Sequence, residues 1–488
     1  MPRPNLASRG IGQSEKRGAK RVPPSPGRRA ARAPRPGQKN ARAIALEILR
    51  RVEATDAYAN RLLDARLGRS RLSGPDRALV TALVYGVLRW RGKLDWILAK
   101  VLDRPLDTLD SPVRHILRLG AYQLCCLTRV PDFAAVDEAV SLARRTGGAR
   151  HASYVNAVLR AVARLRGRPE PDPASNPLGY WETAGSHPRW LVERWIARLG
   201  SDEAGRLMAA NNAIPPVTVV VNELKAREAD LRSALVKAVP GVAEGRWVSG
   251  AFHLRGAGSV GDLPGFAEGW FIPMDEAGVF PVLALDVQPG DRVLDACAGG
   301  GGKSGLIAAR IGSLGEVVAL DSSPRAIRWL EAARARLGLA TVKPHLGDAR
   351  TAGEEWPGRF SRVLLDAPCT GLGVIRRRPD IKWRLRPDDI AALAALQGQI
   401  LAGAAGAVRP GGLLVYSVCT TEPEEGAAVV ASFLEARRDF VPDPLPPMEG
   451  VVPTGRPDLG MMSVWPHRQG TDGFFIARLR RRPIDAQR

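Results

Sequence analysis

The chain has 488 residues, of which 45% are hydrophobic and 25% charged, and 71 Lys and Arg against 50 Asp and Glu give it a formal net charge of +21. This composition excludes collagen-like and wholly disordered proteins, no stretch reaches the roughly 18 apolar residues of a membrane span, and the N-terminus lacks the apolar stretch of a secretory signal. Five cysteines exclude a disulfide framework and no cysteine or histidine spacing fits zinc, so we expect a cytoplasmic protein of two or three domains without a metal.

Positive charge is concentrated at the front of the chain. Residues 1–40 hold 11 Lys and Arg, one acidic residue, seven prolines and five glycines, which predicts a disordered basic arm. Residues 41–165 hold 21 Lys and Arg against 12 Asp and Glu, a net charge of +9, which leaves +2 for residues 166–488. A basic front before a nearly neutral remainder favours nucleic acid as the partner of the front region, although the arm by itself is equally consistent with a solubilising role.

Apolar residues at helical spacing run through residues 41–165 and predict a compact all-α domain. The first such face is Ile44, Ala45, Ile48, Leu49 and Val52. Cys125 and Cys126 lie among leucines, and we expect both to be core residues.

Residues 166–281 predict a linker and a small α+β subdomain. The stretch 166–175 is rich in Arg, Gly and Pro, as linkers are. An amphipathic helix is expected over Trp190–Leu207 and a buried strand over Val217–Val221.

Strands and helices alternate over residues 282–482 and predict an open, mostly parallel, Rossmann-like α/β sheet, with ligands bound at the carboxyl ends of the strands. The expected strands are Arg292–Cys297, Val317–Asp321, Thr341–Leu346, Arg362–Asp366, Gly412–Cys419 and Gly473–Leu479. The expected helices between them are Ser304–Ile311, Pro324–Leu337, Pro387–Val408 and Glu424–Arg437. Residues 483–488 form a tail.

A glycine-rich loop follows the first of these strands. It reads Cys297, Ala298, Gly299, Gly300, Gly301, Gly302 and Lys303. Consecutive glycines let a ligand approach the backbone closely, and the next helix presents its N-terminal amides. A Walker A phosphate loop requires glycine at the position of Cys297, so we reject a nucleotide hydrolase.

Two ligands remain for this loop. Gly300, Gly302 and Gly305 fit the G-x-G-x-x-G pattern of dinucleotide sites, with Asp321 after the second strand to bind the ribose. S-adenosylmethionine needs the same glycine turn and the same carboxylate, and Asp348 after the third strand could hold its adenine. The alternative for both aspartates is a purely structural role as helix caps.

Two cysteines follow the next two strands. Cys369 comes after Asp366-Ala367-Pro368, and Cys419 ends the fifth strand just before a helix. A thiol becomes a strong nucleophile when positive charge or a helix N-terminus lowers its pKa. A lone cysteine in such a place is usually a buried apolar residue, but two at neighbouring strand ends favour chemistry.

These motifs resemble a known family. Asp-Ala-Pro-Cys-Thr-Gly at 366–371 and Pro-Glu-Glu at 423–425 are similar to the Sun-type RNA cytosine-5 methyltransferases. Over residues 41–482 the chain resembles the bacterial RsmB (Sun/Fmu) enzymes, whose helical front module is similar to the antitermination factor NusB. The same resemblance extends over Ser186–Trp195, Ala210–Asn212, Met274–Gly278 and Gly470–Phe475.

The resemblance implies a reaction and a role for each motif residue. Cys419 would add to carbon 6 of a cytidine, with Cys369 as the alternative nucleophile. Asp366 would bind the base edge, Cys369 would help to release the product, and Lys303 would supply a positive charge near both ligands. The implied cofactor is S-adenosylmethionine, and the implied substrate is 16S ribosomal RNA, at the cytidine conventionally numbered 967. We expect a monomer. The cofactor pocket would be lined by Cys297, Ala298, Gly299, Gly300, Gly301, Gly302, Lys303, Asp321, Asp348 and Asp366.

The sequence departs from the family pattern in the glycine loop. The family usually has Ala-Pro where this chain has Gly299 and Gly300, and we expect a more mobile loop and weaker cofactor binding. Two other functions stay open from the sequence: the same reaction on transfer RNA or another ribosomal cytidine, and a non-catalytic RNA-binding assembly factor. Retention of Lys303, Asp366 and both cysteines argues against the second.

Overall fold

The computed structural model describes residues 40–55, 57–165, 170–448 and 454–483. The predicted basic arm before Asn40, residues 166–169 of the predicted linker, and residues 484–488 of the tail lie outside this range. No helix among the described residues is both long and apolar enough to cross a membrane.

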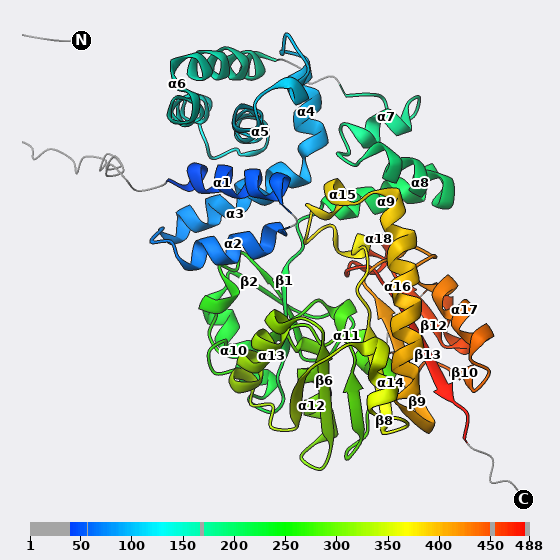
Figure 1. Cartoon of the computed structure of the whole chain (residues 1–488). Helices are drawn as coiled ribbons and strands as arrows, with labels where there is room; N and C mark the ends of the chain where they lie inside the picture. The colour runs from blue at the N-terminus through cyan, green and yellow to red at the C-terminus, as the bar shows by residue number, and fades with distance from the viewer. Residues whose placement is uncertain (1–39, 56, 166–169, 449–453, 484–488) are drawn as a thin grey trace, which may run out of the picture. The chain divides into compact units, whose positions relative to one another are not determined.

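The region from Ala41 to Arg164 is all α-helical, as expected (Figure 1). Its main helices are α1 (Ala41–Ala54), α2 (Ala59–Gly68), α3 (Gly74–Arg89), α4 (Arg91–Ala99), α5 (Ser111–Cys126) and α6 (Asp132–Arg164). The predicted apolar face of α1 is buried in full and packs against α3 and α5. The core assignment of the cysteine pair is wrong for Cys126, which is exposed, and Cys125 is only half-buried. The pair occupies the last turn of α5, where the helix leaves the core.

The linking region builds a small antiparallel sheet in the order β2-β3-β1-β4. Its elements are α7 (Pro177–Glu182), α8 (Arg189–Leu199), α9 (Ser201–Asn212), β1 (Val217–Val221), α10 (Glu228–Ala238), β2 (Gly241–Glu244), β3 (Ala251–Arg255) and β4 (Phe271–Pro273). The strand Val217–Val221 is confirmed. The single helix over Trp190–Leu207 is wrong, because Gly200 adopts a φ of +77° and separates α8 from α9.

The third region contains the larger sheet, in the order β11-β12-β13-β9-β8-β5-β6-β7, with β10 paired to β13. The strands are β5 (Arg292–Asp295), β6 (Glu316–Asp321), β7 (Val342–Leu346), β8 (Phe360–Asp366), β9 (Val408–Val418), β10 (Phe440–Pro442), β11 (Thr454–Arg456), β12 (Met461–Val464) and β13 (Phe474–Arg481). Strands β5 to β9 pair in parallel, and β13 pairs antiparallel to β9. The predicted mostly parallel sheet is thus present, with an antiparallel edge added to it.

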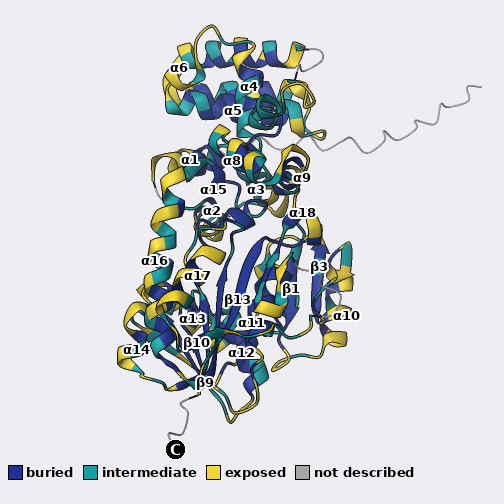
Figure 2. Cartoon of the chain, turned by 90° about the vertical axis from the view of Figure 1, so that its right-hand side faces the viewer, coloured by how far each residue is buried: buried dark blue, intermediate teal, exposed yellow. Residues whose placement is uncertain are grey.

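Helices cover both faces of this sheet (Figure 1). On one face lie α11 (Glu276–Leu285), α12 (Gly302–Ile311) and α13 (Pro324–Leu337). On the other lie α14 (Ala352–Glu355), α16 (Pro387–Gly406) and α17 (Ala427–Ala436). Along β8, Val363 and Leu365 face one helical layer and Leu364 faces the other, so the strand is buried on both sides. Figure 2 shows the strands as buried and the outer helix surfaces as exposed.

The strand order predicts which edge of the sheet binds ligands. The chain runs outward from β5 through β6 to β7, then returns to the other side of β5 as β8. Such a reversal leaves a crevice at the carboxyl ends of the two strands at which it occurs, and ligands of open α/β sheets bind there. The glycine loop after β5 and the Asp366 motif after β8 therefore lie at the switch point.

The segment between β8 and α16 contacts both other regions. Its short helix α15 (Ile381–Arg384) carries Lys382, which is fully buried and donates to the Arg89 carbonyl and to Asn212 Oδ1, each at 3.0 Å. Burial holds the pKa of Lys382 far below its usual value. Arg89 ends α3 and Asn212 ends α9, so this one side chain joins the helical region, the linking region and the third region, which contains the larger sheet.

Candidate functional site

The glycine loop is held by the first strand-end aspartate. Asp321 Oδ2 accepts a hydrogen bond from the Gly299 amide at 2.9 Å, and Asp321 Oδ1 accepts from the Ser323 amide at 2.8 Å. Asp321 therefore fixes the loop and also organises the turn that begins α13. Gly301, the residue before α12, has a φ of +80°, and a Cβ there would lie 2.3 Å from Leu330 Cδ1. Both its conformation and its close packing require glycine.

The residues around this loop fit an adenosine-containing cofactor. A Cβ on Gly299 or Gly300 would meet no heavy atom within 4 Å, so open space adjoins the loop. Asp348, after β7, accepts hydrogen bonds from the Arg350 amide and guanidinium, and these bonds lower its pKa. Asp295 is fully buried, accepts from Ser304 Oγ at 2.6 Å, and has no partner for its second oxygen among the described residues. Burial raises the pKa of Asp295 to about 6.

Cys297 stands apart from the other cysteines of this region. It is half-buried and packs against the apolar core on the α16 side of the sheet. Burial, followed by the charge of Asp295, raises the pKa of its thiol. Cys297 therefore contacts the core at the base of the glycine loop.

Cys369 and Cys419 face each other across neighbouring strand ends. Their Sγ atoms are 3.2 Å apart. The hydrogen bond with Cys419 and burial raise the pKa of the Cys369 thiol well above its ordinary value. Cys369 is therefore kept as a thiol beside the sulfur of Cys419.

Lys303 and Asp366 form an ion pair at the same edge of the sheet. Lys303 Nζ lies 2.6 Å from Asp366 Oδ2, and Ser417 Oγ donates to Asp366 Oδ1 at 2.8 Å. Burial opposes the charge of Lys303, but Asp366 outweighs it and the pKa of Lys303 is raised. The four residues predicted as catalytic thus come together from β8, β9 and α12.

A buried polar network that the sequence reasoning missed supports both cysteine loops. Glu425 accepts from the Thr370 amide at 2.8 Å, from Thr370 Oγ1 at 2.5 Å and from Gln397 Nε2 at 3.0 Å. Tyr416 donates to Gln397 Oε1 at 3.1 Å. Thr370 follows Cys369 and Glu425 lies six residues after Cys419, so this network fixes the two loops relative to each other. The sequence signals for it were Thr370 in the Asp-Ala-Pro-Cys-Thr-Gly motif and Glu425 in the Pro-Glu-Glu motif.

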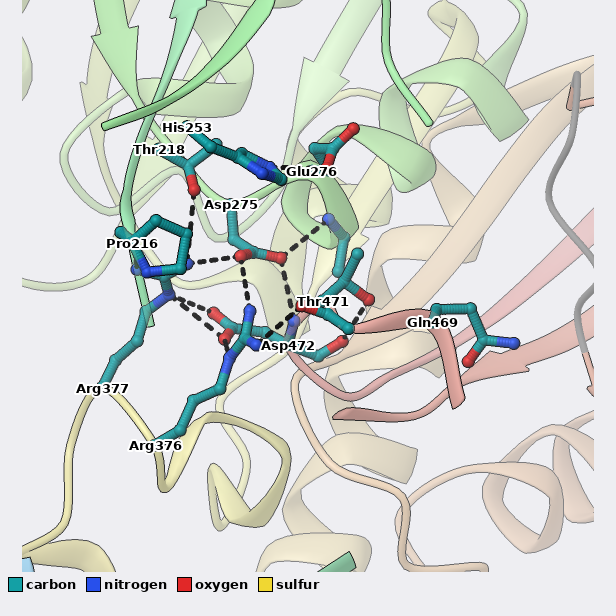
Figure 3. Close-up of polar contacts among 12 residues, drawn as sticks. Pro216, Thr218, His253, Asp275, Glu276, Arg376, Arg377, Gln469, Thr471 and Asp472 are labelled. Atoms are coloured by element: carbon teal, nitrogen blue, oxygen red, sulfur yellow. Dashed lines mark hydrogen bonds and ion pairs between the residues drawn. The ribbon is translucent and has the colours of Figure 1, made fainter. Parts of the chain in front are cut away.

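A second buried cluster joins the linking region to the catalytic region (Figure 3). Asp275 accepts from Arg376 at 2.9 Å and pairs with Arg377, while Asp472 accepts from Arg376 Nε at 2.7 Å and Arg377 Nε at 2.9 Å. Arg377 also donates to the Pro216 carbonyl at 2.8 Å. Burial disfavours the charge of Asp275, but Arg377 and Arg376 outweigh it and its pKa is lowered. Burial, with the Asp275 charge, raises the pKa of Asp472.

No group of three or more His, Cys, Asp or Glu side chains within the described part of the chain is arranged to hold a metal ion. The candidate site is thus made of a glycine loop, strand-end carboxylates, one lysine and two thiols.

The Rossmann-like sheet, with the glycine loop, the carboxylates, the lysine and the two thiols at its carboxyl edge, defines a protein of the methyltransferase class. A family model for "16S rRNA methyltransferase RsmB/F" matches residues 282–480, a NusB family model matches 39–164, and a ferredoxin-like domain model of RsmF/B-like methyltransferases matches 187–261. The chain belongs to the RsmB/F family of 16S rRNA methyltransferases. The expected family is confirmed, as is the expected order of a NusB-like domain, a linking subdomain and a Rossmann-like domain.

Relatives match over nearly their whole length. The chain is 38% identical to a probable ribosomal RNA small subunit methyltransferase B of Bacillus subtilis, over 90% of this chain and 98% of that protein. It is 34% identical to a ribosomal RNA small subunit methyltransferase B of Pseudomonas putida, with the same coverage. The crystal structure of PH0851 superposes with a TM-score of 0.77 at 28% identity and covers 90% of this chain and 98% of that one.

Proposed function

We propose that the protein transfers a methyl group from S-adenosylmethionine to carbon 5 of a cytidine in 16S ribosomal RNA. The observation that carries this proposal is the contact of Cys369 and Cys419, 3.2 Å apart, beside the Lys303–Asp366 pair and the glycine loop. The printed names of the relatives support ribosomal RNA as the substrate. By family resemblance the target is the cytidine conventionally numbered 967.

The chemistry of cytosine explains the thiols. Carbon 5 is a poor nucleophile, so the Cys419 thiolate adds to carbon 6 and forms a C–S bond while electron density moves to carbon 5. The cofactor supplies the methyl group that carbon 5 then attacks. Transfer leaves S-adenosylhomocysteine as the second product. Carbon 5 then loses its proton to water and the C–S bond breaks, which restores the aromatic ring and the Cys419 thiolate.

The neighbours of Cys419 have distinct proposed roles. Asp366 binds the N3/N4 edge of the cytosine and stabilises the adduct, and Ser417 and Lys303 hold its carboxylate in place. Cys369, kept as a thiol, donates to the sulfur of Cys419 and assists release of the product. Asp321 and Asp348 hold the cofactor, and the Asp348 carboxylate can accept from the adenine amino group while it remains paired with Arg350, since it is partly exposed.

The cofactor loop gives the first prediction. We expect Gly299→Ala to weaken S-adenosylmethionine binding about fivefold, because Gly299 has a φ of +55° that costs alanine roughly 1 kcal/mol. The free loop of the variant should relax out of this conformation, and the cofactor must then restore it on binding. The paired change Gly299→Ala with Gly300→Pro should tighten binding, since proline moves residue 299 out of the left-handed region and stiffens the loop. Calorimetric titration measures both. Equal affinity in the wild type and the two variants would contradict this view of the loop.

RNA binding gives the second prediction. If the basic helical region and the linking region supply most of the affinity through the RNA backbone, raising salt from about 50 to 200 mM should weaken binding at least a hundredfold. Fluorescence anisotropy with unmodified small-subunit RNA measures this. Binding that stays constant over that range would refute backbone recognition by these regions.

Methyl transfer separates the competing substrates. Labelled S-adenosylmethionine is incubated with unmodified small-subunit RNA and, separately, with unmodified transfer RNA. We expect transfer to the first and not to the second. Transfer only to transfer RNA would overturn the substrate, and RNA binding without cofactor binding would favour an assembly factor.

A further inference from the structure

A pocket of ≈ 560 Å³ lies between the helical region and the catalytic region, which is in the size range of small-ligand sites. None of Lys303, Asp366, Cys369 and Cys419 lines it, so it is separate from the reaction centre. Thr370, the chain neighbour of Cys369, does line it. Its charged and aromatic wall includes Arg91, His115, Asp380, Trp383 and Arg386.

Two nearly inaccessible side chains in this wall have polar atoms without a partner. Asp380 is 1% exposed, and its Oδ2 accepts from the Ala59 amide at 3.2 Å, but its Oδ1 has no hydrogen-bond partner among the described residues. His115 is 4% exposed, and its Nε2 lies 3.0 Å from Glu53 Oε2 while its Nδ1 has no partner in the same described part of the chain. A buried polar atom left unpaired costs free energy, so a ligand that paired with these two atoms would remove that cost.

Both unpaired atoms are acceptors. The Oδ1 of the Asp380 carboxylate can only accept. Burial lowers the pKa of His115, and a neutral ring whose Nε2–H donates to Glu53 leaves Nδ1 as an acceptor. The interior of the pocket therefore suits a ligand with N–H donors, such as the amino and ring N–H groups of a nucleobase.

The more exposed part of the wall carries positive charge and an aromatic ring. Arg91 Cζ lies 5.2 Å from the centroid of the Trp383 ring, and the nearest carboxylate to Arg91 that forms an ion pair is Asp95, at 3.8 Å. Arg386 is exposed and forms no ion pair within the described residues. Arginine beside tryptophan is the combination that binds a phosphate and stacks a base in single-stranded RNA.

We propose that this pocket binds one nucleotide of the substrate RNA next to the methylated cytidine, with its phosphate at Arg91 and Arg386 and its base between Trp383 and the acceptors of Asp380 and His115. This inference rests on the proposed function. Because Thr370 lines the pocket and Cys369 precedes it, the pocket would hold the RNA strand on one side of the target while the target base enters the reaction centre.

Asp380→Asn tests the recognition of the base. The amide oxygen of asparagine can still accept from the Ala59 amide, so the other side-chain atom becomes a donor where the wild type has an acceptor. The full chain is assayed on unmodified RNA and on a series of RNAs, each with one abasic ribose at a position flanking the cytidine. Asp458→Asn makes the same chemical change at an exposed ion pair and is the matched control.

We expect one abasic position to lower kcat/KM of the wild type and of Asp458→Asn about tenfold. The kcat/KM of Asp380→Asn on intact RNA should be about tenfold lower than that of the wild type. The abasic ribose at that same position should lower it no further, and the cofactor affinity of the variant should be unchanged. An equal abasic penalty in wild type and Asp380→Asn, or no sensitive flanking position, would overturn the proposal. Arg386→Gln, a change at an exposed side chain, should weaken RNA binding severalfold and covers the case in which Asp380→Asn does not fold.

Direct binding of the same RNAs separates this proposal from the proposed reaction. If no methyl group is transferred but RNA binding still depends on one flanking base through Asp380, the proposed nucleotide pocket is supported and the proposed reaction is refuted. If methyl transfer occurs but changes at Asp380 and Arg386 leave RNA binding unchanged, the proposed reaction is supported and the proposed nucleotide pocket is refuted. Competition by free mononucleotides at low millimolar concentration would instead assign the pocket to a free nucleotide and overturn its assignment to RNA.

Discussion

Replacing Cys419 with alanine is expected to abolish methyl transfer, with a loss of roughly four orders of magnitude or more, because the variant has no nucleophile for carbon 6. RNA that contains 5-fluorocytidine at the target provides a direct measurement, since carbon 5 then has no proton to lose and the C–S adduct persists. The wild type should form an adduct that survives denaturation, and Cys419→Ala should form none.

Cys369→Ala distinguishes the two thiols. If Cys369 assists release, this variant should form the adduct on ordinary RNA and accumulate it, while turnover falls. Cys126→Ala, at an exposed cysteine of the helical region, is the matched control and should behave as the wild type. Adduct formation by Cys419→Ala but not by Cys369→Ala would reverse the proposed roles.

Asp275→Ala is expected to lower the free energy of unfolding by about 3–5 kcal/mol, because it leaves Arg376 and Arg377 with one carboxylate in a buried cluster. Its side chain is 8% exposed, and its Oδ1 also accepts from the amides of Ala277 and Asp472 at 3.1 and 2.9 Å. Urea denaturation followed by tryptophan fluorescence measures the change.

Two further variants separate charge from hydrogen bonding in this cluster. Asp275→Asn can keep the bonds to the Ala277 and Asp472 amides and should lose less stability than Asp275→Ala. Asp458→Ala removes an exposed carboxylate that pairs with Arg456 and should cost less than about 1 kcal/mol. An Asp275→Ala protein as stable as Asp458→Ala would show that the cluster does not hold the linking region in place.

The elements that sequence could predict are those whose pattern is local. Val217–Val221 and the helix Pro324–Leu337 have the predicted bounds, because β-branched residues define the first and a Ser323 cap with Pro324 begins the second. The short strands β11 and β12 were missed: they have three or four residues each, and they depend on pairing to each other and to β13 and on the burial of Met462 and Val464 in the core. The break at Gly200, by contrast, has a local signal that the sequence prediction overlooked, since a glycine with positive φ commonly ends a helix.

The candidate site also contains some features that the sequence predicts and others that it does not. Its glycine loop, strand-end carboxylates and two cysteines follow sequence motifs, so their presence at one edge of the sheet could be predicted from strand order. The contact between the two sulfurs could not, since it depends on the buried Glu425 and Thr370 that set the two loops. The same limit applies to Asp380, whose unpaired oxygen is visible only once the helical and catalytic regions are packed together.

Bisulfite sequencing of unmodified small-subunit RNA, before and after incubation with the wild type and S-adenosylmethionine, tests the proposed reaction most directly. The result we predict is one new protected cytidine, absent when Cys419→Ala replaces the wild type. Labelled methyl transfer to that RNA without any protected cytidine would contradict methylation at carbon 5 of cytidine.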